Sequence, residues 1–315
     1  MGEVFPKTLI DFERRFASDE ACRAYLESLR WPDGFICPGC DGKTGWRASR
    51  MRWVCGDCRH QTSVTAGTIF QDSHLPLTVW FRAMWYVTSQ KNGASALAVQ
   101  RLLGLGSYKT AWALLHKLRR AMVRPGRDQL TGQVEVDETF VGGEETGREG
   151  RGALTKALVV IAAEENGRGT GRIRMACIPS AAKRFLHGFV QQAVAPGSTV
   201  HTDGWASYGG LSTHGYGHRV TALKGQPPDA AIVAMPRVHR VASLLKRWLL
   251  GTHQGAVGVD HLDYYLDEFT FRFNRRNSAS RGKLFYRLAQ QAVQVAPVPF
   301  DCLLKPQPLV PGGVK

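Results

Sequence analysis

Two pairs of cysteines near the start of the chain constrain its fold more than any other feature. Cys37-Pro-Gly-Cys40 and Cys55-Gly-Asp-Cys58 both have the C-x-x-C spacing, and residues 41–54 separate them. This is close to the spacing of a four-thiolate zinc site. Two such turns on facing hairpins complete a tetrahedron of sulfur ligands, which leaves no open position for catalysis. The cysteines therefore predict a zinc ribbon at residues 31–72 that holds a structural Zn²⁺ ion.

The chain carries a large excess of positive charge. Among 315 residues, 41 are Lys or Arg and 26 are Asp or Glu, which gives a formal net charge of +15. Such an excess favours a polyanionic partner, because Lys and Arg displace counterions from phosphates. The alternative is a basic protein without a specific ligand. The length and the hydrophobic content of 43% are sufficient for two or three domains.

The sequence gives no indication of a membrane or secreted protein. No stretch approaches the ~18–20 apolar residues that a membrane span needs, and the N-terminal residues lack an apolar signal core. Of the seven cysteines, the scattered Cys22, Cys177 and Cys302 are typical of buried or inert thiols in a reducing compartment. We therefore expect a cytoplasmic protein with no membrane partner.

Helical patterns flank the predicted ribbon. Residues 8–29 have apolar side chains near helical spacing and predict one amphipathic helix within an N-terminal segment, 1–30. After the ribbon, residues 73–125 contain an aromatic-rich helix, a second helix ending near Gly104, and a third from about Tyr108 to Met122. A helix, a glycine-containing turn and another helix are the outline of a helix-turn-helix.

Basic side chains occupy the outer face predicted for the last of these helices. Trp112, Leu115, Leu118 and Met122 form its expected inward stripe. The candidate DNA contacts on the polar part of this helix surface are Lys109, Lys117, Arg119 and Arg120. The alternative is an ordinary helical hairpin with a solvated basic face. The zinc ribbon and the net charge favour contact with DNA.

A break rich in Pro and Gly at residues 125–132 precedes a different pattern. A strand, a second and a third strand, a helix and a fourth strand predict an α/β fold with a mixed sheet. The expected elements are strands at 134–141, 157–163, 173–178 and 198–202, a helix at 180–194, a loop at 206–236, closing helices at about 238–250 and 261–273, and a C-terminal tail at 281–315.

Two aspartates occupy matching places in this arrangement. Asp137 lies on the first strand and Asp203 ends the fourth. If those strands are neighbours, both carboxylates project from one region of the sheet, where α/β proteins place ligands. Paired carboxylates in a basic protein indicate a divalent-metal site for phosphoryl transfer, with Mg²⁺ or Mn²⁺. Taken alone, either aspartate is more typical of a turn at a strand end.

Four segments in combination resemble bacterial insertion-sequence transposases of the DDE superfamily. They are similar to the subset with an amino-terminal zinc ribbon (ISXO2-like), and the resemblance runs from about residue 30 to 280. The segments are QTSVTAGT from Gln61, VEVDETFVGG from Val134, HTDGWASY from His201, and the stretch from Val238 that ends in EFTFRFNRR at Arg276. The set is specific in combination, although no single segment is.

The resemblance implies an RNase H-like catalytic core at residues 132–280. Its first acidic position matches Asp137 and its second matches Asp203. When the shared Ser-Leu-Leu-Lys at 243–246 is aligned, the third acidic position falls on His239. Lys246 follows two helical turns later on the same face.

Histidine at the third position departs from the acidic triad. A neutral imidazole ligates divalent metals but brings no negative charge. The alternatives are a hydrogen bond from His239 to a phosphate oxygen or to water, or a role as a helix cap. Glu268, on the amphipathic closing helix, is a rival third ligand.

The resemblance implies a DNA transposase. We expect it to bind the terminal inverted repeats of an insertion sequence and to catalyse metal-dependent strand cleavage and strand transfer, as a homo-oligomer on double-stranded DNA at the nucleoid. Lys246, Arg275 and Arg276 are candidate contacts to transposon-end phosphates, with a solvated basic face as the alternative. The alternative function is a DNA-binding regulator with an inactive nuclease-like domain.

Overall fold

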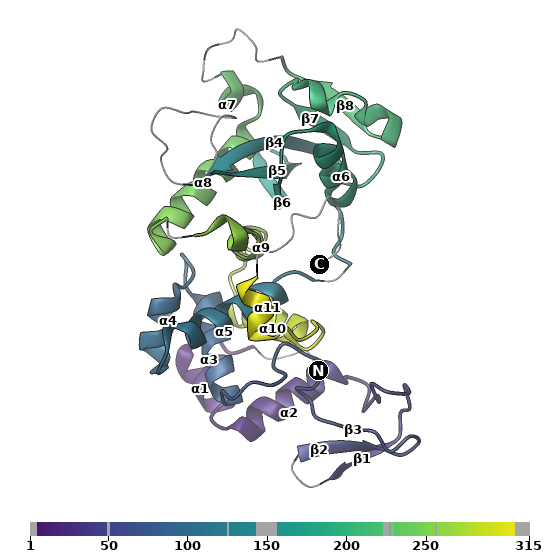
Figure 1. The fold of residues 1–315 in the computed structure, drawn as a ribbon, viewed down its shortest axis with the longest axis vertical. Helices are drawn as coiled ribbons and strands as arrows, with labels where there is room; N and C mark the ends of the chain where they lie inside the picture. Colours follow the sequence, from purple (N-terminus) through teal and green to yellow (C-terminus); the bar gives the residue numbers. More distant parts are fainter. Residues whose placement is uncertain are drawn as a thin grey trace. The chain divides into compact units, whose positions relative to one another are not determined.

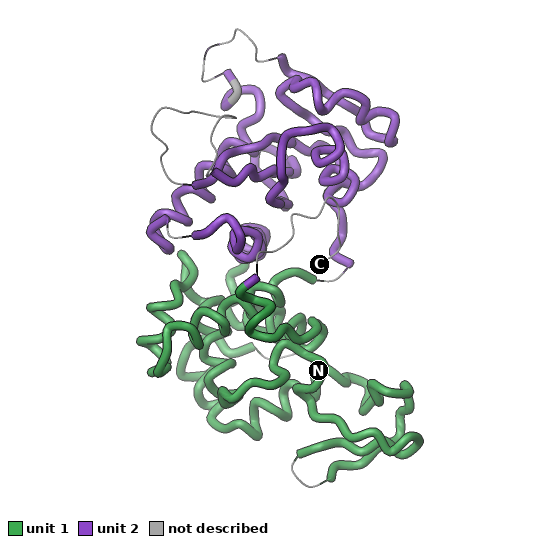
Figure 2. Tube along the Cα trace, in the orientation of Figure 1, with its two compact units in different colours: residues 1–124, 277–304 green, residues 125–276, 305–315 purple. Residues whose placement is uncertain are grey.

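The computed structural model describes residues 5–48, 51–124, 126–142, 156–222, 227, 230–255 and 257–305. The chain divides into two compact units (Figure 2). Residues 1–124 and 277–304 form unit 1, and residues 125–276 and 305–315 form unit 2. Within the described part of the chain, no helix combines the length and the apolar character needed to cross a membrane.

The zinc-ribbon region of unit 1 contains a three-stranded antiparallel sheet. Strand β2 (Arg52–Cys55) lies between β1 (Gly45–Ala48) and β3 (Gln61–Thr62). The aromatic rings of Phe35 and Trp53 stack beside it with centroids 5.0 Å apart. Few apolar side chains are available in so small a module, so its stability depends on aromatic packing and on its cysteines.

Helices make up the rest of unit 1 (Figure 1). They are α1 (Leu9–Arg15), α2 (Asp19–Arg30), α3 (Leu77–Ser89), α4 (Ala96–Leu103), α5 (Tyr108–Ala121), α10 (Arg281–Ala292) and α11 (Phe300–Leu304). The prediction of one helix over 8–29 is wrong, because the chain breaks between α1 and α2. Ser18 caps α2 by accepting a hydrogen bond from the amide of Ala21. A serine at this place starts a new helix rather than continuing the old one.

The predicted tail at 281–315 is also wrong for residues 281–304. Helix α10 packs against α3, and Phe285 is fully buried against the rings of Phe12, Phe16 and Phe81. Leu284, Phe285 and Leu288 have helical spacing and are buried, so these residues complete the core of unit 1. Residues 306–315 of the predicted tail lie outside the described residues.

Unit 2 is a mixed α/β domain. Its sheet has the order β6-β5-β4-β7-β8, with β4–β5 and β5–β6 antiparallel and β4–β7 and β7–β8 parallel. The strands are β4 (Gln133–Val141), β5 (Ala157–Asn166), β6 (Gly169–Ile178), β7 (Thr199–Thr202) and β8 (Gly217–Val220). Strand β8 lies inside the predicted loop at 206–236, so that prediction is wrong there. A short polar strand such as β8 forms because the free edge of β7 supplies its hydrogen-bonding partners.

Helices cover both faces of the sheet in unit 2 (Figure 1). Helix α6 (Lys183–Ala193) packs on the face that receives Val134 and Val136 of β4. Helices α8 (Pro236–His253) and α9 (Leu262–Phe273) pack on the opposite face, and a short helix, α7 (Ala230–Ala234), precedes α8. Because side chains alternate along a strand, residues 135, 137 and 139 face α8.

Candidate functional site

The four ribbon cysteines converge on one point. Their Sγ atoms all lie within 4.8 Å of one another, and the Cys37–Cys58 and Cys40–Cys55 sulfur pairs are each 3.6 Å apart. Zn–S bonds of about 2.3 Å in a tetrahedron place neighbouring sulfurs about 3.8 Å apart. The spacing therefore fits one zinc ion held by all four cysteines, with no ligand position left for chemistry.

Local sequence builds both halves of this cluster in the same way. The amides of Asp41 and Arg59 donate to the carbonyl oxygens of Cys37 and Cys55, at 2.9 and 3.2 Å. Both Asp41 and Arg59 follow the second cysteine of a pair and adopt a left-handed conformation, with φ of 59° and 62°. Each C-x-x-C segment thus closes into a tight turn that points two thiols the same way.

The structure brings Asp137 and Asp203 to the same level of the sheet. Strands β4 and β7 are parallel, with Glu135 opposite His201. Asp137 lies two residues after Glu135 and on the same face of β4, and Asp203 lies two residues after His201, just beyond the end of β7. Asp203 directly follows β7, and its carboxylate accepts a hydrogen bond of 2.9 Å from the amide of Trp205.

His239 of α8 completes this cluster. Its Nε2 atom lies 3.8 Å from Oδ2 of Asp137. Burial lowers the pKa of the imidazole, against smaller opposing effects from the Glu135 and Asp203 carboxylates, so the neutral ring is favoured at pH 7. Nε2 is buried and has no hydrogen-bond partner among the described residues. A neutral ring nitrogen beside the Asp137 carboxylate is a suitable ligand for a divalent cation.

Glu135, which the sequence analysis did not single out, fixes α8 above β4. It is 1% exposed and accepts hydrogen bonds from the amides of Arg237 and Val238, at 2.8 and 3.0 Å. The guanidinium of Arg237 adds a contact of 2.7 Å. Because α8 has no side-chain N-cap of its own, Glu135 satisfies its first free amides. This contact holds His239 opposite Asp137. Strand alternation in VEVDE was the sequence signal from which the role of Glu135 could have been found.

Replacing Glu135 with Ala should strongly destabilise unit 2, since it leaves Arg237 and the start of α8 without their buried partner. We expect a loss of about 3–5 kcal/mol, which corresponds to a fall in the melting temperature of about 6–20 °C. Calorimetry measures this directly. Glu165→Ala is the matched control, because Glu165 also pairs with Arg237 but is 35% exposed, and such pairs contribute about 0–1 kcal/mol. Equal shifts in the two variants would contradict the proposed anchoring.

Two further candidates do not join the cluster. Glu268 is 1% exposed and its carboxylate lies 2.9 Å from the guanidinium of Arg272 in the same helix. Its helix α9 packs against the edge strand β6, which β5 separates from β4. Lys246 is exposed and lies seven residues, or about 10 Å, along α8 from His239. A small cavity of about 140 Å³ beside Asp137 and His239 is lined by neither residue.

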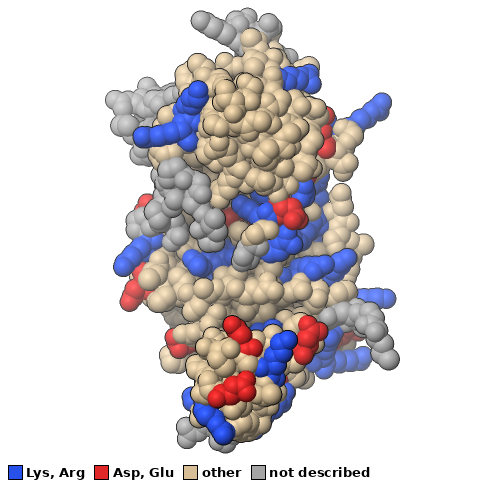
Figure 3. Space-filling view, turned by 90° about the vertical axis from the view of Figure 1, so that its right-hand side faces the viewer, with Lys and Arg blue, Asp and Glu red and all other residues tan. Residues whose placement is uncertain are grey.

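The remaining predicted DNA contacts differ in accessibility. Lys109 and Arg276 are exposed, and Lys117, Arg120 and Arg275 are half-buried. Arg119 is only 2% exposed, so its assignment to an exposed basic face is wrong. Arg119 lies on the same face of α5 as Leu115, Leu118 and Met122, which form the inward stripe of the helix. On the face drawn in Figure 3, Lys and Arg side chains cover more surface than Asp and Glu.

Comparisons with known proteins agree with this arrangement. Residues 129–274 match the ISXO2-like transposase domain, and residues 17–61 match the transposase zinc-ribbon domain. The first match spans the mixed sheet and its Asp137–His239 cluster, and the second spans the cysteine cluster. The chain therefore contains an ISXO2-like transposase domain that follows a transposase zinc-ribbon domain.

A relative of this chain occurs in an archaeal mobile element. It is a protein in transposable element ISH50 of Halobacterium salinarum, 28% identical over 279 residues. The aligned region covers 82% of this chain and 92% of the relative.

Proposed function

We propose that this protein is a DNA transposase that binds the terminal inverted repeats of an insertion sequence and catalyses metal-dependent strand cleavage and strand transfer. The observation that carries this proposal is the 3.8 Å approach of His239 to Asp137 on β4, next to the paired strand β7 that Asp203 follows. These residues come from three elements distant in sequence, and they occur in a basic chain that contains a transposase domain.

The sheet supports an RNase H-like catalytic core. In order of occurrence its strands are arranged 3-2-1-4-5, with the first three antiparallel and the last two parallel to the first. The first strand is the central one and carries Asp137, and the fourth strand pairs with it and precedes Asp203. Side chains on interior strands have a rigid base, which a site for positioned phosphates requires.

Asp137, Asp203 and His239 would hold Mg²⁺ or Mn²⁺, with the two carboxylates as hard oxygen ligands. When bound, such cations activate an attacking oxygen and stabilise a leaving oxygen in phosphodiester chemistry. In the proposed reaction, water attacks the end phosphodiester and the P–O bond to the 3′ oxygen breaks. The freed 3′-hydroxyl then attacks a phosphodiester of the target DNA, where a new P–O bond forms and the bond to the target strand's own 3′ oxygen breaks. The chain's own residues position the phosphate, and no protein nucleophile takes part.

Unit 1 supplies the proposed recognition of DNA ends. The zinc ribbon and the α4–α5 hairpin present basic residues, among them Lys109, Lys117 and Arg120. Arg275, Arg276 and Lys246 of unit 2 would contact backbone phosphates. Joining two ends requires more than one active site, so we propose a homo-oligomer on DNA, acting at the nucleoid.

The direct test uses purified wild-type protein and labelled DNA carrying the ends of the encoding element, with and without Mg²⁺. We expect end-specific, Mg²⁺-dependent cleavage and joining to a target plasmid. Specific end binding without any cleavage would instead establish the alternative, a DNA-binding regulator with an inactive nuclease-like domain. Absence of end-specific binding would contradict both functions.

His239 has its own prediction. We expect His239→Ala to lower the cleavage rate by about 10–100-fold, the range typical of losing a group that supports a metal site. His239→Glu should retain more activity than His239→Ala, because a carboxylate restores an oxygen ligand. Single-turnover cleavage at several Mg²⁺ concentrations makes the comparison. A wild-type rate in His239→Ala would show that the ring only packs against β4.

A further inference from the structure

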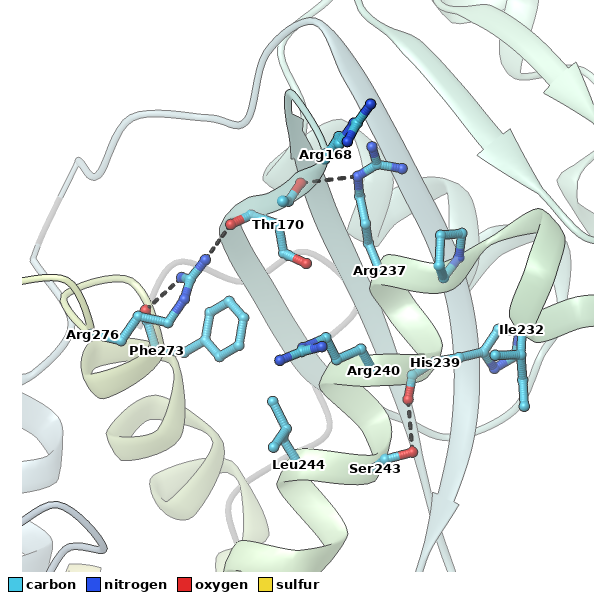
Figure 4. A pocket seen from close by; sticks show the side chains of 12 residues that line it. Arg168, Thr170, Ile232, Arg237, His239, Arg240, Ser243, Leu244, Phe273 and Arg276 are labelled. Atoms are coloured by element: carbon cyan, nitrogen blue, oxygen red, sulfur yellow. Dashed lines mark hydrogen bonds between the residues drawn. The ribbon is translucent and has the colours of Figure 1, made fainter.

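A second, larger cavity of unit 2 shares His239 with the small cavity beside Asp137. Its volume is about 650 Å³, and it lies between the β5–β6 turn, α8 and the end of α9 (Figure 4). Four arginines line it, namely Arg168, Arg237, Arg240 and Arg276. None of the described residues in this lining is Asp or Glu. A concave site that gathers positive charge without carboxylates is suited to an anion.

In the described part of the chain, carboxylates neutralise one of these four arginines. Arg237 pairs with Glu135 and Glu165 at 2.7 and 2.8 Å. Arg276 instead donates to the carbonyl oxygens of Thr170 and Phe273, which carry no net charge. Among the described residues, no ion pair to a carboxylate is present for Arg168, Arg240 or Arg276. The cavity therefore retains positive charge after its internal contacts are satisfied.

Arg240 and Arg276 also act on each other. Partial desolvation of the Arg276 guanidinium lowers its pKa, and the nearby positive charge of Arg240 lowers it further. Figure 4 shows Arg240 directed toward Leu244 and Phe273, on the side of α8 where Arg276 reaches Thr170. Two guanidinium groups that repel each other are stabilised by an anion placed between them.

A ring contact holds the guanidinium of Arg276 in place in the cavity. The guanidinium of Arg276 lies 4.0 Å from the centre of the Phe273 ring, a cation–π distance that fixes its plane. Guanidinium groups match phosphate oxygens in paired hydrogen bonds. Leu244 and Phe273 add apolar surface, on which the sugar of a nucleotide can rest.

The cavity lies next to the candidate active site. His239 lines both cavities, and Arg240 is the next residue of α8. We propose that Arg168, Arg240 and Arg276 bind a backbone phosphate of the DNA strand, other than the phosphate that is cleaved. This inference rests on the proposed transposase function, and it assigns a strand-positioning role to the surface of α8 beside His239.

The test compares Arg240→Gln with the matched control Arg184→Gln, in full-length protein. Arg184 is an exposed arginine on α6, which covers the opposite face of the sheet. For Arg240→Gln we expect weaker binding to end DNA and to unrelated DNA by the same factor. The slope of log affinity against log salt concentration should also fall by about one, as for the loss of one phosphate contact. Arg184→Gln should match the wild type.

The outcomes separate this inference from the proposed function. If the wild type cleaves end DNA but Arg240→Gln and Arg276→Gln keep the wild-type salt slope, the phosphate site is refuted while the transposase function stands. If the wild type neither binds nor cleaves end DNA, the proposed function itself fails. A free phosphate ion has the same chemistry as a DNA phosphate, so inorganic phosphate is used as the second probe. An Arg240-dependent rise in melting temperature with inorganic phosphate, without a change in DNA salt slope, overturns the assignment to DNA.

Discussion

Asp137→Asn and Asp203→Asn are each expected to lower strand cleavage and strand transfer by about a thousandfold or more. Each substitution removes one negative ligand from the proposed metal site, whose charge stabilisation is worth several kcal/mol, and about 4 kcal/mol corresponds to a thousandfold in rate. Single-turnover cleavage of labelled end DNA measures the loss. Specific binding of the same DNA should be retained, because unit 1 carries the proposed end-recognition surface.

These variants should also keep their fold. The side chain of Asp203 accepts a hydrogen bond from the amide of Trp205, and that of Asp137 accepts one from the amide of Glu138. The amide oxygen of asparagine can accept both bonds. Asp260→Asn is the control, since Asp260 is an exposed acidic residue of unit 2 outside the cluster. Near-normal cleavage by Asp137→Asn or Asp203→Asn would refute the catalytic assignment.

Removal of zinc is the second large expected effect. In small metal-bound modules, most of the folding free energy comes from the metal, about 10–16 kcal/mol for structural zinc. Cys37→Ser, or treatment with a strong chelator, should therefore unfold the three-stranded sheet of the ribbon and abolish specific binding of end DNA. Zinc content by mass spectrometry of the intact protein and binding by gel shift are the two measurements.

The control for the zinc prediction is Cys302→Ser. Cys302 is exposed and lies far along the chain from the ribbon, on α11. This variant should keep one equivalent of zinc and bind end DNA like the wild type. Retention of tightly bound zinc by Cys37→Ser would show that Cys37 is not a ligand, and unchanged end binding by zinc-free protein would remove the ribbon from DNA recognition.

The candidate site was partly visible in the sequence. Alternation in β4 and the order of the strands placed Asp137 and Asp203 in one region of the sheet only on the condition that their strands are neighbours, and the structure shows that β4 and β7 do pair. His239 came only from resemblance, because nothing local in α8 shows which residue of a helix will face a strand 100 residues earlier. Its place depends on Glu135, whose buried carboxylate binds the first amides of α8.

The errors in the predictions have two kinds of cause. The break at Ser18 and the inward position of Arg119 follow from local capping and helical spacing, whereas the strand β8 and the burial of residues 281–304 depend on tertiary partners. Apolar spacing over 8–29 suggested one helix, but the capping of α2 by Ser18 interrupts it. The residues of β8 have little strand character of their own and pair because β7 offers an open edge. Residues 281–304 joined unit 1 because Phe285 completes its aromatic core.

By itself, the sequence determined the features that depend on short spacing: the thiol pairs that converge on a zinc site, the apolar stripes of the helices, and the alternation that turns Asp137 toward one face of its strand. Tertiary structure alone decided which distant groups meet, including Glu135 with the start of α8, His239 with Asp137, and the uncompensated arginines beside them. The physical reason is the distance along the chain over which each interaction acts. Backbone geometry and side-chain periodicity act over a few residues, whereas ion pairing, metal ligation and burial act between any groups that folding brings within a few ångströms.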